Sequence, residues 1–248
     1  MTHRSAPHRP AWLLLLSLTV VSLGALSLDT TPASAQDQTG DAVQKDDRAN
    51  PYGTGAGGAI LLTNNGFGLG GYFRRELGAS TSFLVEANLG AGKDDRELKF
   101  YQFGSGIVPN KRNYFLMAPI HLGAQHRLFS EHIEDNFRPY VHVSGGPTFG
   151  WEYPYFDDKN DNEIFDDAID RRYDIFSAFP RGRLRFGLGG TVALGAFFGT
   201  SRKVTQGVRF GYVFNYFFDG VQLLEPDVKA AQSVFHSPVI SIVFGKLF

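Results

Sequence analysis

From residue 57 onward, hydrophobic and polar residues alternate along the chain, in runs interrupted by turn-forming residues. A period of two is the pattern of a β-strand with one apolar and one polar face. Eight such runs can be recognised, and each predicts a strand. They cover Gly57–Thr63, Gly66–Glu76, Ala79–Gly90, Asn113–Phe129, Phe137–Phe149, Gly182–Phe198, Lys203–Phe218 and Pro238–Phe248.

The lengths of the runs and of their connections select one kind of all-β fold. Several runs exceed the ~5–6 residues usual for a soluble strand and reach the ~9–11 residues that a tilted strand needs to cross a bilayer. Three connections are long, at 91–112, 150–181 and 219–237, and the others are short. Long loops at one end and short turns at the other are typical of outer-membrane barrels. We therefore predict an eight-stranded antiparallel up-and-down transmembrane β-barrel over residues 55–248.

The two faces of the runs differ in charge. In a membrane barrel the apolar face meets lipid and the polar face fills the lumen. Eight strands enclose an interior that side chains just fill, so no open pore is expected. Because buried charges need partners, the two glutamates of the polar face are expected to pair with some of its arginines. The predicted lumen network comprises Arg74, Glu76, Glu86, His121, Gln125, Arg127, Arg138, His142, Arg183, Arg185 and Arg209.

Aromatic residues gather near the predicted strand ends. Membrane barrels carry such residues in girdles at the two lipid–water interfaces. The residues predicted to form the girdles are Tyr72, Phe73, Tyr114, Phe115, Phe149, Trp151, Tyr153, Phe217, Phe218 and Phe248.

The alternative fold for the whole chain is a soluble lipocalin-like ligand carrier. In such a carrier the two faces are reversed, so the interior is apolar.

The N-terminal segment has the pattern of an export signal. Basic residues precede an apolar run at 11–28, and Ala33-Ser34-Ala35 provides a small-residue cleavage pattern. Residues 1–35 are therefore predicted to be a cleaved secretory signal peptide. Residues 36–54 are polar and without apolar periodicity, which predicts a disordered lead-in.

Composition narrows the function. The net charge of −1 gives no basic footprint for nucleic acid. The absence of cysteine excludes disulfides, thiolate metal sites and a cysteine nucleophile. A mean hydropathy of −0.16 excludes a bundle of membrane helices.

The acidic stretch 157–170 is the one candidate metal site in the sequence. Oxygen-bearing side chains stand at positions 1, 3, 5 and 9 of a calcium-loop register. Glu163 replaces the usual glycine, and Ile169 stands where a bidentate acid belongs. A solvated acidic loop is the alternative; otherwise no cofactor is expected. The candidate calcium ligands are Asp158, Asn160, Asn162 and Asp166.

Three classes of function remain open. A structural or interaction role, carried by the long loops, needs no catalytic group. A lipid A-modifying enzyme needs a nucleophile beside a base, and His236-Ser237 near Asp219, Glu225 or Asp227 is the tempting set. Adjacent strand residues point to opposite faces, so we expect no catalysis. A passive solute channel is the third class.

The last eight residues, SIVFGKLF, resemble the terminal β-signal of bacterial outer-membrane barrels. Lys246 stands where that family usually has an aromatic residue. Residues 55–248 as a whole resemble the small OmpA/OmpX-like eight-stranded barrels. The resemblance implies a bacterial outer-membrane location, with both termini in the periplasm and the long loops outside. It also implies contact with outer-membrane lipids and lipopolysaccharide, and recognition by the barrel-assembly machinery through Phe244, Gly245 and Phe248.

Overall fold

The computed structural model describes residues 53–94, 96–97, 100–102, 105–130, 133, 136–199 and 204–248. All of them belong to one compact unit, 46–248. The predicted signal peptide, 1–35, lies outside the described residues. So does the predicted lead-in, 36–54, except for its last two residues, and Thr54 already begins the first strand.

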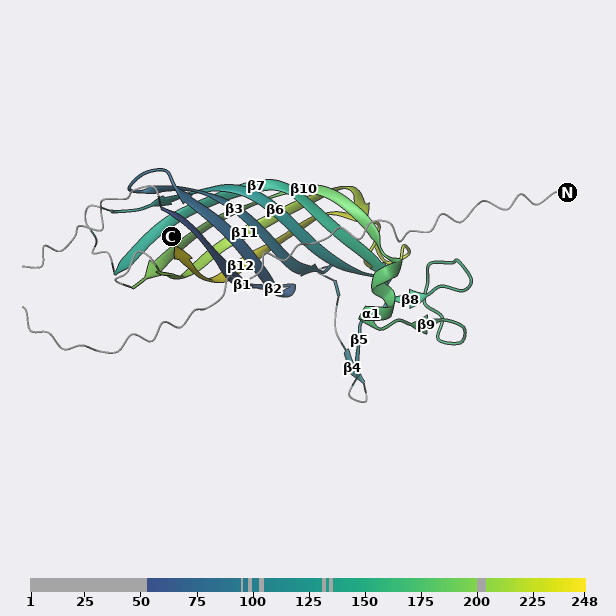
Figure 1. Ribbon diagram of the computed structural model, residues 1–248. Coiled ribbons are helices and arrows are strands. Elements are labelled where there is room, and N and C mark those ends of the chain that lie inside the picture. The colour runs from purple at the N-terminus through teal and green to yellow at the C-terminus, as the bar shows by residue number, and fades with distance from the viewer. Residues whose placement is uncertain are drawn as a thin grey trace, which may run out of the picture. The chain divides into compact units, whose positions relative to one another are not determined.

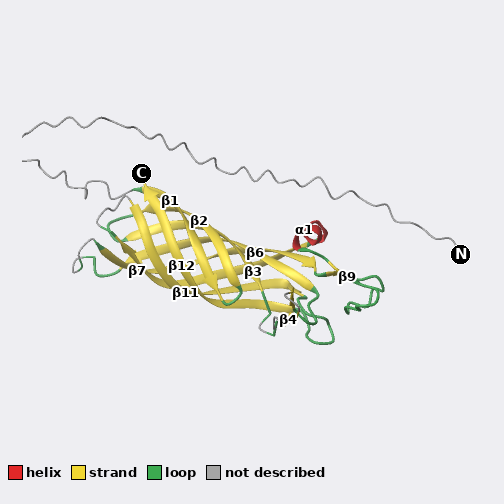
Figure 2. Ribbon diagram, turned by 90° about the horizontal axis from the view of Figure 1, so that it is seen from below, coloured by secondary structure: helices red, strands yellow, loops and turns green. Residues whose placement is uncertain are grey.

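Eight antiparallel strands form a closed barrel, which confirms the predicted fold (Figures 1 and 2). Each strand pairs with its neighbours along the chain, and the first strand pairs with the last. The order around the barrel is β1-β12-β11-β10-β7-β6-β3-β2. The bounds are β1 Thr54–Thr63, β2 Gly66–Glu76, β3 Thr81–Gly92, β6 Asn113–Arg127, β7 Phe137–Pro154, β10 Arg183–Phe198, β11 Val204–Val221 and β12 Gln232–Leu247.

The outside of the barrel is apolar, whereas the inside holds buried charged residues together with apolar ones. Phe67, Leu69 and Val192 point outward with exposed fractions of 80, 66 and 63 %, whereas the charged residues Glu86 and Arg209 are buried inside. A transmembrane β-barrel has an apolar exterior and a closed ring of strands, in which every strand is paired on both sides. The soluble carrier alternative requires the reverse arrangement.

The connections differ between the two ends of the barrel. At the end where β1 starts and β12 finishes, short connections join β2 to β3, β6 to β7 and β10 to β11. The long loops lie at the other end, called the loop end below, together with the turn at 64–65 (Figure 1). The loops contain β4 Phe100–Gln102, β5 Ser105–Ile107, β8 Phe156–Asp157, β9 Arg171–Arg172, α1 Ile175–Ala178 and the 3₁₀ turn η2 Phe179–Arg181. No helix in the described part of the chain is long and apolar enough to cross a membrane.

Strands extend further toward the loop end than the sequence predicts. β7 continues to Pro154 and β11 to Val221, and β12 begins at Gln232 rather than at Pro238. Pro238 has no N–H to donate, and it lies just beyond the last β12 residue that is paired with β1. A proline is tolerated at such a free edge, so it does not mark the start of the strand.

Candidate functional site at the loop end

An ion-pair network crosses the middle of the lumen. Glu86 Oε1 on β3 accepts a hydrogen bond of 2.7 Å from Arg209 Nη1 on β11. Its Oε2 lies 3.1 Å from Nε2 of His142 on β7. All three side chains are buried. Because β3 and β11 stand opposite each other in the ring of strands, this ion pair bridges the lumen.

The other predicted lumen residues lie on either side of this network. His121 is buried and pairs in register with Glu86. Toward the short-turn end, Arg74 Nη2 lies 3.8 Å from Glu76 Oε1. A cavity of about 80 Å³ at that end is lined in part by Arg74, Glu76, Gln125, Arg127 and Arg138. Arg183 and Arg185 lie instead at the loop end of the lumen.

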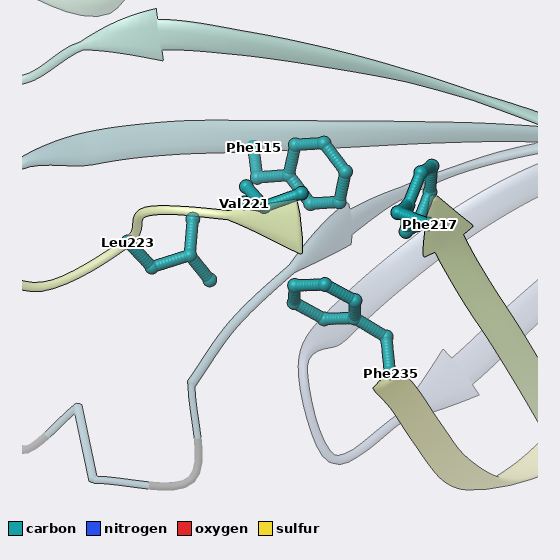
Figure 3. Close-up of a cluster of buried hydrophobic side chains, with 5 residues drawn as sticks. All are labelled: Phe115, Phe217, Val221, Leu223 and Phe235. Carbon is teal, nitrogen blue, oxygen red and sulfur yellow. The ribbon is translucent and has the colours of Figure 1, made fainter. Parts of the chain in front are cut away.

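Three aromatic rings belong to a cluster of buried hydrophobic side chains on the loop-end side of the ion pair (Figure 3). Phe115, Phe217 and Phe235 come from three strands, with ring centroids 5.0 to 5.7 Å apart. Val221 and Leu223 complete this cluster, called the aromatic plug below. Its members are at most 3 % exposed. The plug packs this part of the lumen with apolar side chains.

The aromatic plug corrects part of the predicted girdles. Phe115 and Phe217 point inward rather than toward lipid, and Tyr153 is also buried. Side chains alternate strictly along a strand, and Phe115 has the parity of His121, just as Phe217 has the parity of Arg209. Proximity to a strand end therefore does not show that an aromatic side chain faces lipid; its position in the inward–outward alternation does.

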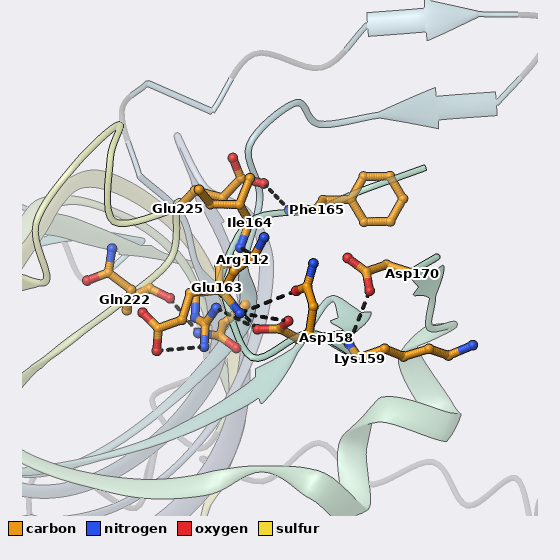
Figure 4. Close-up of polar contacts among 12 residues, drawn as sticks. Arg112, Asp158, Lys159, Glu163, Ile164, Phe165, Asp170, Gln222 and Glu225 are labelled. Atoms are coloured by element: carbon orange, nitrogen blue, oxygen red, sulfur yellow. Dashed lines mark hydrogen bonds and ion pairs between the residues drawn. The ribbon is translucent and has the colours of Figure 1, made fainter. Parts of the chain in front are cut away.

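Ion pairs and hydrogen bonds tie the three long loops together (Figure 4). Arg112 Nη2 donates to Glu163 Oε1 at 3.0 Å, and its Nη1 lies 3.6 Å from Asp158 Oδ2. Glu225 Oε1 accepts a hydrogen bond of 2.9 Å from the Phe165 N–H. Lys229 Nζ, in the last loop, donates to Asp94 in the first. The loops therefore support one another above the barrel.

A polar cavity of about 320 Å³ lies where the lumen opens between these loops. It is called the mouth cavity below. Four arginines and two glutamates line it, which leaves two positive charges in excess. The lining comprises Arg112, Asn113, Glu152, Pro154, Glu163, Arg181, Arg183, Arg185 and Gln222.

Glu152 organises the wall of the mouth cavity. Its Oε2 accepts from Nε and Nη2 of Arg185 at 2.7 and 2.6 Å. Its Oε1 accepts from Asn113 Nδ2 at 3.1 Å and from the Gln222 N–H at 2.9 Å. Charge-assisted bonds of this kind fix geometry strongly. Sequence reasoning missed Glu152 because it placed residue 150 onward in a loop, although the inward parity of Thr148 continues to 152.

A short helix positions a third arginine of the mouth cavity. Asp174 caps α1 by accepting hydrogen bonds from the Phe176 and Ser177 N–H groups. The hydroxyl of Ser177 also donates to Asp174, which lowers the pKa of this carboxyl. The Arg181 guanidinium donates to the Ser177 carbonyl and lies 4.6 Å from the ring of Tyr173.

Arg183 is the arginine of the mouth cavity without a partner. Its side chain has no hydrogen bond or ion pair with the described residues, and it is exposed. Arg185 is neutralised by Glu152, and Arg112 by Glu163 and Asp158. The excess positive charge of the cavity therefore belongs to Arg181 and Arg183.

The four candidate calcium ligands lie in the stretch 158–166, where Asp158 is half-buried and the other three are exposed, and their oxygen atoms accept backbone hydrogen bonds. Asp158 accepts from the N–H groups of Asn162 and Glu163, and Asn160 also accepts from Asn162. Asn162 accepts from the N–H of Ile164, and Asp166 from that of Ala168. Glu163 makes the sharp turn with a φ of 65° although it is not glycine. Calcium binding by this loop stays a prediction.

The proposed catalytic pair of the enzyme alternative is split by the strand. His236 points outward, where its Nδ1 lies 2.5 Å from the hydroxyl of Tyr212. Ser237 points inward, is buried, and accepts a hydrogen bond from the Asn64 N–H. A Ser–His pair therefore does not form here.

The terminal strand closes the barrel. The backbones of Phe248 and Thr54 exchange hydrogen bonds of 2.7 and 3.3 Å. Gly245 lies opposite Gly57 in the register of β12 and β1, and a Cβ atom at Gly245 would meet the hydroxyl of Tyr72. Phe244 points outward, 49 % exposed. Glycine is therefore required for packing at 245, whatever its role in assembly.

Comparisons with known proteins give structural likenesses only. No protein-family model matches the chain, and no curated protein matches it. Neisserial surface protein A aligns at 13 % identity over 79 % of this chain and 95 % of its own, with a TM-score of 0.38. The N-terminal barrel domain of Pseudomonas aeruginosa OprF aligns at 7 % identity over 78 % and 96 %, with a TM-score of 0.39.

A third solved structure shows a similar degree of likeness. The attachment invasion locus protein Ail of Yersinia pestis, in complex with the heparin analogue sucrose octasulfate, aligns at 11 % identity. The alignment covers 79 % of this chain and 97 % of that protein, with a TM-score of 0.39. The assignment of the fold rests on the strand pairing of this chain itself.

Proposed function

We propose that this protein is a bacterial outer-membrane barrel that conducts no solutes and binds an anionic partner at its loop end. The apolar exterior and the export signal predicted over 1–35 support the location. We propose the orientation in which both termini lie in the periplasm and the long loops face the outside of the cell.

The mouth cavity carries the proposal. Binding residues commonly stand on loops that a rigid scaffold positions, and here the three loops are tied to each other and to the barrel rim. Two uncompensated arginines, Arg181 and Arg183, face a cavity of about 320 Å³. Guanidinium groups match phosphate, sulfate and carboxylate oxygens in geometry and charge. The phosphate groups of lipopolysaccharide are the partner that the proposed location supplies.

Two barriers inside the lumen argue against a channel. The Glu86–Arg209 ion pair bridges the barrel, and the aromatic plug lies between this pair and the loop end. A solute would have to displace both. Near-zero conductance in planar bilayers is the expected result, and stable ion-conducting steps from wild-type protein would refute a filled lumen.

The location is tested by fractionation and gel mobility. Folded membrane barrels resist cold detergent, so an outer-membrane fraction run with and without boiling should give two mobilities. A protein found only in the soluble periplasmic fraction, with a single mobility, would overturn the membrane assignment.

Anion binding is tested with Arg183→Gln. Titration of the folded barrel with lipid A should give an affinity about three- to tenfold weaker in the variant, because a partnerless cation is lost from the cavity. Arg171→Gln is the matched control: Arg171 is exposed in the same loop but does not line the cavity.

The arms of the titration separate the possible partners. Lipid A without phosphates should bind weakly to the wild type. High salt should weaken the binding of phosphorylated lipid A, because salt screens the attraction between charges. Inorganic pyrophosphate, in a parallel arm, tests whether free phosphate suffices. Equal affinities of wild type, Arg183→Gln and Arg171→Gln would contradict the assignment of the mouth cavity.

Recognition of the last strand by the barrel-assembly machinery is part of the same proposal. Phe244, Gly245 and Phe248 are its proposed determinants. Deletion of Phe248 should lower the yield of heat-modifiable barrel in cells, while refolding of the purified chain in detergent is retained. A loss of both would assign Phe248 a role in stability alone.

A further inference from the structure

The barrel wall has a notch beside its shortest connection at the loop end. β1 ends at Thr63, which pairs with Val239, whereas β12 begins at Gln232. The turn at 64–65 is therefore set back from the start of β12. In the described part of the chain, no strand pairs with the β1-facing edge of residues 232–238.

A mostly apolar cavity of about 70 Å³ adjoins this notch. Its lining includes inward-pointing side chains such as Leu61 and Phe235, and the outward-pointing Phe67, Leu89 and His236. Phe67 and Leu89 are 80 and 47 % exposed on the apolar outer surface. The cavity therefore lies between inward-pointing and lipid-facing residues of the barrel wall.

Two buried hydrogen-bond donors line the lumen side of this cavity. Arg209 and Ser241 are direct neighbours across β11 and β12, and both line the cavity. Arg209 Nε and Ser241 Oγ are buried and have no hydrogen-bond partner among the described residues. Glu86 holds Arg209 through Nη1, and Arg209 Nε makes no hydrogen bond with the described residues. Buried donors nearly always have an acceptor, so these two donors call for an acceptor that the described residues do not supply.

We propose that this cavity binds the carboxylate of a long-chain fatty acid that enters from the bilayer through the notch. A carboxylate supplies two acceptor oxygens for two adjacent donors, and its charge complements a guanidinium. The cavity has room for only a few water-sized groups, which fits a carboxyl group and its first methylenes but excludes a phospholipid headgroup. The rest of the chain lies along Phe67 and Leu89, in lipid.

The test uses oleate labelled with ¹³C at its carboxyl carbon and the barrel folded in phosphatidylcholine nanodiscs. The wild type should show one protein-bound carboxyl signal that is distinct from oleate in lipid. Gly90→Leu fills the cavity from its wall, and a Cβ there meets nothing closer than the Gly68 Cα at 3.9 Å. This variant should lose the bound signal.

Two serine variants separate the contact from general effects. Ser241→Ala should weaken oleate binding about fivefold or more, because it removes one donor. Ser82→Ala is the matched control, since Ser82 is a lumen-facing serine that lines the cavity at the short-turn end and does not line this one. The methyl ester of oleate should bind less well than oleate to the wild type.

Each contrary result overturns a part of the proposal. Absence of a bound signal in the wild type means that water alone satisfies the donors, which refutes a lipid site. Unchanged binding in Gly90→Leu places the fatty acid elsewhere. Equal binding of wild type and Ser241→Ala refutes the carboxylate contact. Gel mobility before and after heating verifies the fold of each variant, and Ser241→Ala carries the test if Gly90→Leu does not fold.

Discussion

Replacing Glu86 with leucine should destabilise the barrel strongly, whereas replacing its partner as well should restore most of the loss. Glu86 is 4 % exposed, and it is bonded to Arg209 at 2.7 Å and lies 3.1 Å from His142. Glu86→Leu leaves the Arg209 charge buried without its carboxylate. The double variant Glu86→Leu/Arg209→Met removes both charges and fills the space with apolar groups of similar length.

The magnitude follows from the cost of an uncompensated buried charge. Removal of one partner of a buried pair costs about 3–5 kcal/mol, whereas exchange of both for apolar residues is often neutral. A hydrogen bond to a charged group contributes about 1.5–3 kcal/mol, and Glu86 has two charged or chargeable neighbours. We therefore expect a loss of about 3–5 kcal/mol for Glu86→Leu and less than about 2 kcal/mol for the double variant.

Urea unfolding from phosphatidylcholine vesicles measures both values. Trp151 reports on the transition, because the other tryptophan, Trp12, lies in the predicted signal peptide. Linear extrapolation gives the free energy of unfolding, and gel mobility confirms that the folded state is the barrel. A Glu86→Leu midpoint equal to that of the wild type, or a double variant as unstable as the single one, would refute the reasoning.

Four further predictions follow from the lumen and the loops. Phe217→Ala should cost about 3–5 kcal/mol as a fully buried ring, yet conductance should stay near zero because the Glu86–Arg209 pair remains; open-channel steps from this variant would contradict two independent barriers. Gly245→Val should prevent a heat-modifiable barrel, because its Cβ would meet Tyr72 and lie 2.6 Å from the Ala56 oxygen; wild-type mobility would show that this packing is loose. Because the pKa of Asp174 is lowered in the folded protein, its carboxylate should cap α1 fully above the ordinary pKa of an aspartate and lose the cap as pH falls through the lowered pKa. Loss of the cap is measured as faster hydrogen exchange at the Phe176 and Ser177 amides, and Asp174→Ala should remove this pH dependence. Calcium must compete with Arg112 for Asp158, so Arg112→Gln should bind Ca²⁺ severalfold more tightly than the wild type in calorimetry; no heat of binding in either protein would refute the calcium prediction.

Local alternation predicts the barrel well, because each strand needs only its own sequence to define its two faces. The pattern 83–89, with Phe83 and Val85 against Glu86, places the glutamate inside without knowledge of any other strand. The same rule, applied strictly, would also have placed Phe115, Phe217 and Glu152 inside. Those three were missed because strand ends were read from turn chemistry and aromatic content rather than from continued parity.

The alternation of polar and apolar residues within one strand does not predict which charged residues pair with each other inside the lumen. Arg209 and Glu86 are separated by 123 residues in the sequence, and each could face any of several opposite charges. Only the closure of the ring makes β3 and β11 opposite strands, and only the register of each pair sets the two residues at the same height. The same holds for Glu152 and Arg185 in the mouth cavity, where β7 had to extend past its predicted end.

Closure also explains why the two faces should tolerate substitution differently. An outward residue such as Leu69 or Val192 meets lipid, so another apolar side chain of different shape replaces it at little cost. An inward residue such as His142 has neighbours from strands on several sides, and a change in its size or charge leaves a buried group without a partner. The notch, the mouth cavity and the cavity at the short-turn end are described places where inward groups line open space rather than other side chains. The notch and the mouth cavity carry the proposed binding functions, so function is expected to depend on the inward residues near those two openings. The lipid-facing surface is expected to vary in detail while it stays apolar.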